Sequence, residues 1–185
     1  MRIAVYSGSF DPLHIGHKAI MEYLTGEKAF DWVYLVISPQ NPFKDPSKAL
    51  TGEERYKAAV AAVLRCPELH VWVDNIELSM SPPHYTIRTL DALREREPHN
   101  EFRLVIGSDN LSSFRGWKDY GRILCEYGLS VYPRPGFDPA GHVASLKAED
   151  SSYDIETIDA PVLDISSTFI RNSIAEGKDM SEYLM

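Results

Sequence analysis

The chain has 185 residues, of which 44% are hydrophobic and 25% are charged, and its formal net charge is -8. This size and composition predict a single globular domain over residues 1–185 with one continuous core. An acidic chain without a basic face is not expected to bind nucleic acid or an anionic membrane surface, so any phosphate site must be local.

Two cysteines, Cys66 and Cys125, occur without a CxxC pair, so no disulfide framework and no cysteine-rich zinc site is predicted. The opening segment MRIAVYSGSF lacks the apolar core of a signal peptide. No apolar run approaches the roughly 18 residues of a membrane-spanning helix. We therefore expect a cytoplasmic protein.

The first predicted element is a buried strand over residues 3–6, which ends at Ser7-Gly8-Ser9. A helix over residues 13–24 should follow, with Asp11-Pro12 at its start and Gly26 at its end. Proline suits the first turn of a helix and glycine suits its end. A strand, a glycine turn and a helix in this order are typical of the opening of a Rossmann-like unit.

The alternation of strands and helices then continues along the chain. Further strands are predicted over residues 32–37, 69–73, 102–106 and 129–132. Further helices are predicted over 51–65 and 86–97, and from Ser167, as N-cap, to Gly177. Long loops are expected at 38–50, 74–85 and 133–152. The pattern predicts an α/β fold, a single Rossmann-like domain whose mostly parallel sheet has helices on both faces and binds ligands beyond the carboxyl ends of its strands.

The densest chemical signal is GSFDPLHIGH, residues 8–17, at the junction of the first strand and the first helix. Gly8 lets the backbone pass close to a ligand, and free N–H groups at a helix start bind anions. His14 and His17 share one helical face, from which both can donate hydrogen bonds to phosphate oxygens. An isolated histidine pair more often satisfies only core or surface hydrogen bonds. No third ligand converges in the sequence, so no protein-held metal is predicted.

GSFDPLHIGH resembles the signature of the nucleotidyltransferase superfamily related to class I aminoacyl-tRNA synthetases, and ISSTFIR, residues 165–171, resembles the second ATP-binding motif of the small adenylyltransferases. A synthetase is not expected, because the chain leaves no room for a tRNA-binding body and has no KMSKS sequence. Hydroxyls at the start of a helix can hold phosphate, although N-capping is their plainer role. With Arg134 of the PRPG segment, the resemblance implies these ATP-binding residues: Gly8, Ser9, Phe10, His14, His17, Arg134, Ile165, Ser166, Ser167, Thr168 and Arg171.

Between the two motifs the chain resembles bacterial nicotinate-nucleotide adenylyltransferase in the segments SPQNPFKD, PPHYTIRTL, VIGSDNLSSFRGW and VYPRPG. The resemblance implies that Asp109 contacts the ribose of nicotinate mononucleotide and that Trp117 stacks near the pyridine ring. Tyr85 and Thr86 match the family's YT pair, whose backbone N–H groups are expected to receive the nicotinate carboxylate. Core packing is the plainer role for Trp117.

Two further residues are implied at the phosphates. Lys44 would approach the ATP phosphates or the attacking phosphate, and Arg134 would lie beside the triphosphate. A lone loop lysine is usually only solvated, and an arginine there can be a simple turn residue. Three features depart from the family pattern: Phe43 in place of histidine, His84 in place of serine, and a tail that stops at Met185 before the terminal helix of many members. They leave loop geometry, substrate affinity and oligomeric contacts open.

The expected reaction transfers AMP from ATP to nicotinate mononucleotide and releases pyrophosphate, with His14, His17, Lys44 and Arg171 as catalytic residues and Mg²⁺ carried by ATP. ATP and the mononucleotide are the expected partners, and a homo-oligomer is left open. Three alternatives remain. Nicotinamide mononucleotide or phosphopantetheine could be the acceptor, although the phosphopantetheine family usually has threonine at the position of His14. The third is a non-catalytic nucleotide sensor.

Overall fold

The computed structural model describes residues 1–39 and 50–185, and its centre is a six-stranded sheet in the order β3-β2-β1-β4-β5-β6. All neighbouring strands in it are parallel. The strands are β1 (Arg2–Gly8), β2 (Trp32–Ile37), β3 (Val71–Asp74), β4 (Glu101–Gly107), β5 (Leu129–Tyr132) and β6 (Ile155–Thr157). The order reverses between β1 and β4, which is the switch point where ligands bind in open α/β sheets.

Helices cover both faces of the sheet, as predicted. They are α1 (Ile15–Thr25), α2 (Gly52–Leu64), α3 (Ile76–Ser79), α4 (Thr86–Arg96), α5 (Tyr120–Arg122), α6 (Ala140–Glu149) and α7 (Ser167–Ala175). Two 3₁₀ segments, η1 (Ser108–Gly116) and η3 (Ser181–Tyr183), and one π-helical turn, η2 (Ile123–Tyr127), complete the described elements. Apolar residues of α1 and α2 belong to one core, while those of α4, η2 and α6 belong to the other.

The two cores explain why the central strands read as continuous apolar runs. In β1, Ile3 and Val5 face one core, whereas Ala4 and Tyr6 face the other. A strand buried on both faces needs apolar residues at successive positions, and this is the pattern that predicted β1.

Several of the sequence predictions about elements are wrong: β6 was not predicted, and the expected loop at 74–85 contains the short helix α3. The first helix starts at Ile15, with His14 as its N-cap in extended backbone (φ -142°), so Asp11-Pro12 belongs to the preceding turn. The expected loop at 133–152 contains α6, which has only Leu146 buried and therefore shows almost no apolar periodicity in the sequence.

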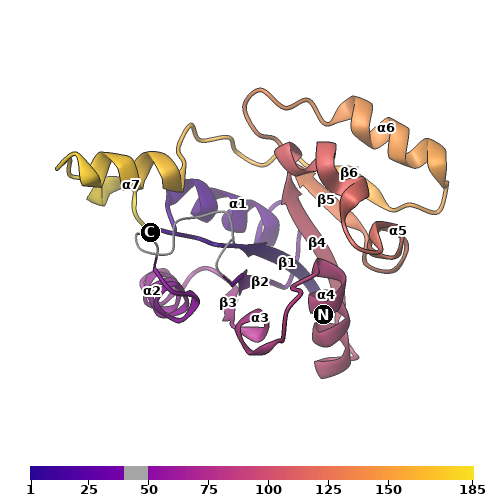
Figure 1. Cartoon of the computed structure of the whole chain (residues 1–185), viewed down its shortest axis with the longest axis horizontal. Helices are drawn as coiled ribbons and strands as arrows, with labels where there is room; N and C mark the ends of the chain where they lie inside the picture. Colours follow the sequence, from indigo (N-terminus) through magenta and orange to yellow (C-terminus); the bar gives the residue numbers. More distant parts are fainter. Residues whose placement is uncertain (40–49) are drawn as a thin grey trace.

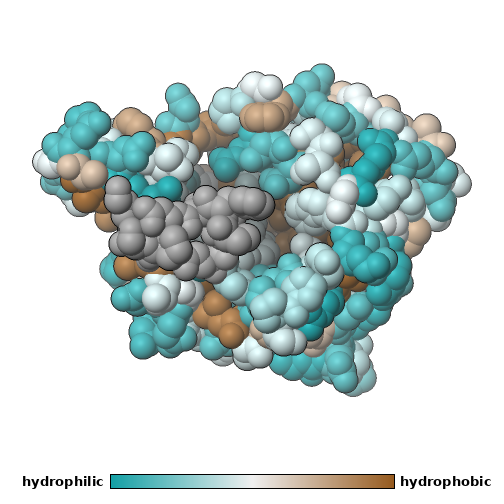
Figure 2. All heavy atoms as spheres, in the orientation of Figure 1, coloured by the Kyte–Doolittle hydropathy of each residue, from teal (hydrophilic) through white to brown (hydrophobic). Residues whose placement is uncertain are grey.

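Figure 1 shows α6 and α7 at opposite ends of the molecule, with the C-terminus between α7 and α2. Figure 2 shows hydrophilic residues over most of the same face, and a hollow near its centre in which hydrophobic residues are visible. Within residues 1–39 and 50–185, none of the helices combines the length and the apolarity that crossing a bilayer requires.

Candidate active site

The turn between β1 and α1 carries the first motif and lies beside the switch point of the sheet. Phe10 adopts a left-handed backbone (φ 44°), and its buried ring lies over Gly8, where an added Cβ would come within 3.0 Å of the ring. The same ring meets the imidazole of His17 edge-on, with 5.1 Å between centroids. A larger residue at Gly8 would therefore push against the Phe10 ring, which packs against His17.

His14 and His17 form a stacked pair at the start of α1. Their ring centroids are 3.7 Å apart, and the backbone N–H of His14 donates to Nδ1 of His17 at 3.3 Å. Burial, followed by the nearby cation of Arg134, lowers the pKa of His14 to about 4. Burial also lowers the pKa of His17 well below its usual value, followed by the effects of His14 and Arg134. Both rings are neutral at pH 7, and His17 carries its proton on Nε2 because Nδ1 accepts a hydrogen bond.

The second motif forms the first turn of α7. The N-cap is Ser166, whose hydroxyl accepts the N–H of Phe169 at 3.1 Å. The prediction of Ser167 as N-cap is wrong, because the extended residue that precedes the helix is Ser166. Ser167 instead donates its hydroxyl to the carbonyl of Pro12 at 3.0 Å.

Arg171 ties α7 to the first motif. Its guanidinium donates to the backbone carbonyl of Asp11 and to the hydroxyl of Thr168, the latter at 3.2 Å. Its Nη1 also lies 3.9 Å from the Asp11 carboxylate. The two motifs, which lie far apart in the sequence, are thereby fixed against each other through direct hydrogen bonds.

Two neighbouring clefts open where the motifs meet. The first, of about 340 Å³, is lined by Tyr6, Ser7, Gly8, Ser9, Phe10, His14, His17, Asn110, Tyr132, Arg134, Ser166, Ser167, Thr168 and Arg171. The second, of about 460 Å³, is lined by Asp109, Arg134, Pro135, Phe137, Leu163, Asp164, Ile165, Ser166 and Phe169. They share Arg134 and Ser166. Every residue that the sequence predicts for ATP binding therefore lines one or both of these clefts.

Asp109 and Arg134 stand at the boundary between the clefts. Nε of Arg134 lies 3.7 Å from the Asp109 carboxylate, and its backbone N–H donates to the hydroxyl of Ser108 at 2.9 Å. A Cβ on Gly107 would collide with the Asp109 carboxylate and come within 3.0 Å of Arg134, so a larger residue there would displace both side chains. Asp109 thus lies next to the second motif, and its contact with the acceptor's ribose stays a prediction.

The residues predicted to hold the nicotinate group line neither cleft. Tyr85 is the N-cap of α4 and Thr86 its first residue. Trp117 follows η1, and its ring packs against Phe114 with 5.0 Å between centroids. Next to Tyr85, Nδ1 of His84 is buried and has no hydrogen-bond partner among the described residues. Lys44 and Phe43 lie outside the described residues.

The cleft also contains groups that the sequence analysis missed. The hydroxyls of Tyr6 and Tyr132 lie 3.3 Å apart in its wall, and burial raises the pKa of both phenols. Their positions near the carboxyl ends of β1 and β5 are the signal that could have identified them. The C-terminal tail also reaches the site, since Leu184 forms an antiparallel bridge with His14 and the N–H of Met185 donates to the Leu13 carbonyl. No motif in the sequence indicates these tail contacts.

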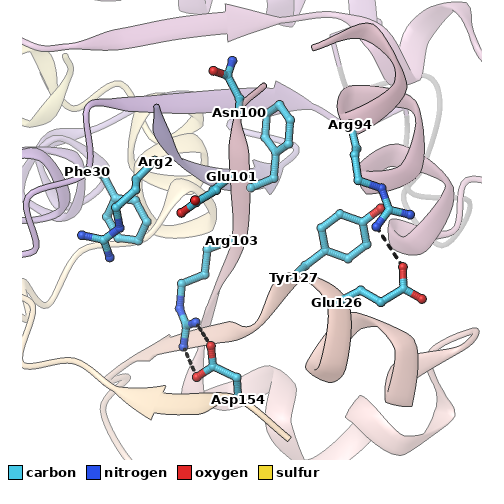
Figure 3. Close-up of a pocket in the computed structure, with 10 residues that line it drawn as sticks. Arg2, Phe30, Arg94, Asn100, Glu101, Arg103, Glu126, Tyr127 and Asp154 are labelled. Carbon is cyan, nitrogen blue, oxygen red and sulfur yellow. Dashed lines mark hydrogen bonds and ion pairs between the residues drawn. The ribbon is translucent and has the colours of Figure 1, made fainter. Parts of the chain in front are cut away.

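A further hollow, of about 470 Å³, lies at the amino ends of the strands, away from both motifs. Its charged groups largely satisfy one another (Figure 3): Arg103 pairs with Asp154, and Arg94 pairs with Glu126 at 2.9 Å. The Arg2 guanidinium lies 5.0 Å from the Phe30 ring. Because it lies at the edge of the sheet opposite the motifs, we assign this hollow no part in the reaction.

Comparisons with known proteins agree on the family of this site. A model of the cytidylyltransferase-like family matches residues 5–173. Among similar curated proteins, the probable nicotinate-nucleotide adenylyltransferase of Porphyromonas gingivalis is 40% identical, over 100% of this chain and 89% of that protein. The protein of the same name from Bacteroides fragilis is 37% identical, over 99% of this chain and 87% of that protein.

The fold is also similar to solved structures. The nicotinic acid mononucleotide adenylyltransferase of Plasmodium falciparum, complexed with NaAD, matches with a TM-score of 0.78 at 18% identity. The match covers 98% of this chain and 87% of that one. At this identity the likeness concerns the fold, and it agrees with the Rossmann-like sheet described above.

Proposed function

The chain belongs to the cytidylyltransferase-like family, and we propose that it transfers AMP from ATP to nicotinate mononucleotide, giving nicotinate adenine dinucleotide and pyrophosphate in NAD biosynthesis. One observation carries the proposal: the glycine turn after β1, the stacked histidines and the first turn of α7 converge on a single cleft of about 340 Å³. This arrangement offers backbone N–H groups, neutral imidazoles and an arginine to a polyphosphate.

ATP would occupy both clefts. Its phosphates would lie in the first, between the turn at Gly8 and Ser9, the histidine pair, and the start of α7. Its adenine would lie in the second, where the apolar side chains of Phe137, Leu163 and Phe169 suit a flat heterocycle. Arg134, which lines both clefts, would lie at the junction of sugar and phosphates.

The acceptor's phosphate would attack the α-phosphorus of ATP in line with the departing pyrophosphate. An oxygen of the mononucleotide phosphate forms the new P–O bond, and the bond from the α-phosphorus to the bridging oxygen breaks. The nucleophile is already anionic, so no general base is needed. Catalysis then depends on alignment and on donors that meet the growing charge, for which we assign His14, His17 and Arg171, with Lys44 as a further candidate.

Neutral histidines suit this task. A neutral imidazole donates one hydrogen bond to a phosphate oxygen, and it can take up a proton as negative charge accumulates nearby. ATP would enter as its magnesium complex, in which phosphate oxygens and water hold the ion. The part of the chain that the structure describes contains no group of three or more histidine, cysteine or carboxylate side chains that could hold a metal, and no step is assigned to one.

Nicotinate mononucleotide would bind beside the ATP site, against α4 and η1. The N-terminus of α4, which begins at Thr86, would offer N–H groups to its carboxylate, whereas the N–H of Tyr85 already donates to the carbonyl of Pro83 at 3.1 Å. Asp109 would accept from ribose hydroxyls, and Trp117 would contact the pyridine ring. A preference for the acid over the amide would then come from backbone donors rather than from an arginine.

Pyrophosphate release tests the acceptor assignment. Purified protein is given Mg-ATP with nicotinate mononucleotide, nicotinamide mononucleotide, phosphopantetheine or no acceptor. A strong preference for nicotinate mononucleotide supports the proposal. Preference for the amide would overturn the carboxylate site, and turnover of phosphopantetheine would overturn the acceptor class. ATP binding without release in any sample would favour a nucleotide sensor.

A further inference from the structure

Two buried charged residues near the clefts, Arg55 and Glu77, have no part in the reaction described so far. Arg55 lies in α2 and is only 2% exposed. Its guanidinium donates to three backbone carbonyls, those of Ser9 at 2.6 Å, Ser38 at 2.8 Å and Leu50 at 3.3 Å. One side chain therefore holds the first motif, the end of β2 and the segment before α2 together.

Glu77 is the second buried charged residue, and it also bonds the chain next to the first motif. It lies in α3 and is 5% exposed, and its Oε1 accepts the hydroxyl of Thr89 at 2.8 Å and that of Ser7 at 3.4 Å. No lysine or arginine of the described residues forms an ion pair with it. Within the described residues this buried carboxylate is held by hydroxyls, and burying a carboxylate costs stability, which favours a role in positioning over a role in holding the fold together.

The two residues belong to one hydrogen-bonded network. The hydroxyl of Ser7 lies 3.0 Å from that of Ser38, whose carbonyl receives Arg55. The network thus runs from α4 through Thr89, Glu77, Ser7, Ser38 and Arg55 to Ser9. One end is the helix proposed to receive the mononucleotide, and the other is the turn proposed to receive ATP phosphates.

We propose that Arg55 and Glu77 are positioning residues which act through this network to set the first motif and α4 relative to each other. The inference rests on the proposed function, because it places one substrate at each end. In-line attack needs the two phosphates to be aligned, and a displacement of about 1 Å can lower turnover by roughly 10²-fold. Breaking the network should therefore lower kcat more than it changes the binding of either substrate.

The test compares Arg55→Lys, Glu77→Gln and the double variant. Lysine keeps the charge but cannot bond three carbonyls in a planar fork, and glutamine keeps the shape of glutamate. We expect each single change to lower kcat by about 10-fold or more, with the KM for ATP within about threefold of the wild type. The kcat of the double variant should lie within about threefold of that of the worse single variant, since either single change already disrupts the shared network.

Arg103→Lys is the matched control. Arg103 is also mostly buried, and it bonds the Leu129 carbonyl and the Ser130 hydroxyl. It lies at the opposite end of the strands, where Figure 3 shows its pairing with Asp154. The Arg103→Lys change should lower Tm about as much as Arg55→Lys does and should leave kcat unchanged. If the Arg55 and Glu77 variants behave like this control, or if their losses in kcat multiply in the double variant, the proposal is overturned.

Two precautions keep the test decisive. If Arg55→Lys does not fold, Thr89→Val removes one hydroxyl from the network and is paired with Glu77→Gln under the same expectations. The wild type is assayed first with nicotinate mononucleotide. Its inactivity would contradict the proposed function, whereas an active wild type with variants that match Arg103→Lys contradicts only the positioning role.

Discussion

The imidazole rings of His14 and His17 lie stacked with 3.7 Å between their centroids, and the backbone N–H of His14 donates to Nδ1 of His17. This hydrogen bond leaves Nε2 of His17 as the donor of the neutral ring. Burial lowers the pKa of His17 most, and repulsion from a protonated His14 ring at this distance lowers it further.

Replacing His17 removes one donor from the proposed phosphate site. We expect His17→Ala to lower kcat by about 10²-fold, the usual effect of losing one transition-state donor, with the fold intact by circular dichroism. His99→Ala changes an exposed histidine outside both clefts and serves as control. Near-normal turnover of His17→Ala would remove this residue from the mechanism.

Stability should depend on pH through His14. Its pKa of about 4 in the folded protein lies below the value of about 6.5 in the unfolded chain, so the unfolded chain binds the proton first as the pH falls. The stability that the neutral, buried form of His14 contributes is fully present above about pH 6.5. It is lost as the pH falls from about 6.5 to about 4.

Urea unfolding at about pH 7.5 and about pH 5 measures this effect. The wild type should lose roughly 2 kcal/mol more stability than His14→Gln over this interval, since carboxylate titration is common to both. Equal losses in the two proteins would show that His14 is not buried in its neutral form.

Arg171 should contribute mainly to the binding of ATP. Charge-assisted hydrogen bonds contribute about 1.5–3 kcal/mol, so Arg171→Met should weaken the binding of a non-hydrolysable ATP analogue by roughly 10- to 100-fold in calorimetry. Arg122→Met removes an exposed arginine that pairs with Asp91 and Glu126, and it should leave this affinity unchanged. An unchanged affinity in Arg171→Met would place the triphosphate elsewhere.

Trp117 should contribute mainly to the binding of the acceptor, nicotinate mononucleotide. We expect Trp117→Ala to raise the Kd of nicotinate mononucleotide by about 10-fold, because an aromatic stacking contact is lost, and to leave the Kd of the ATP analogue unchanged. Trp72→Ala, at an exposed position of β3, is the control and should alter neither. The opposite result, weaker ATP binding with normal mononucleotide binding, would contradict the assignment.

The sequence predicts β1 to β5 of the sheet, because a buried parallel strand requires successive apolar residues. It fails for β6 and α6, which lie at the edge of the sheet and bury few residues: Leu146 alone is buried in α6. The start of α1 is misplaced because Asp11-Pro12 satisfies the local rules for a helix start, while the tight turn at Phe10 is set by packing against Gly8.

For the candidate site, motifs predict many of the residues that line the two clefts, but neither Tyr6 and Tyr132 nor the contacts that hold the motifs together. The bonds of Arg171 to Asp11 and of Ser167 to Pro12 join distant segments and have no local signature. Arg55 is different, because it shares the buried face of α2 with Ala59 and Ala62, and a charged residue on an apolar face could have been noticed. The prediction for Lys44 remains untested.

The most direct test of the central claim follows the α-phosphate. The protein is incubated with nicotinate mononucleotide and ATP radiolabelled at either the α- or the γ-phosphate, and the products are separated by chromatography. The account predicts that the α label appears in nicotinate adenine dinucleotide and the γ label in pyrophosphate. A γ label on the acceptor, or an α label found only in free AMP, would contradict adenylyl transfer.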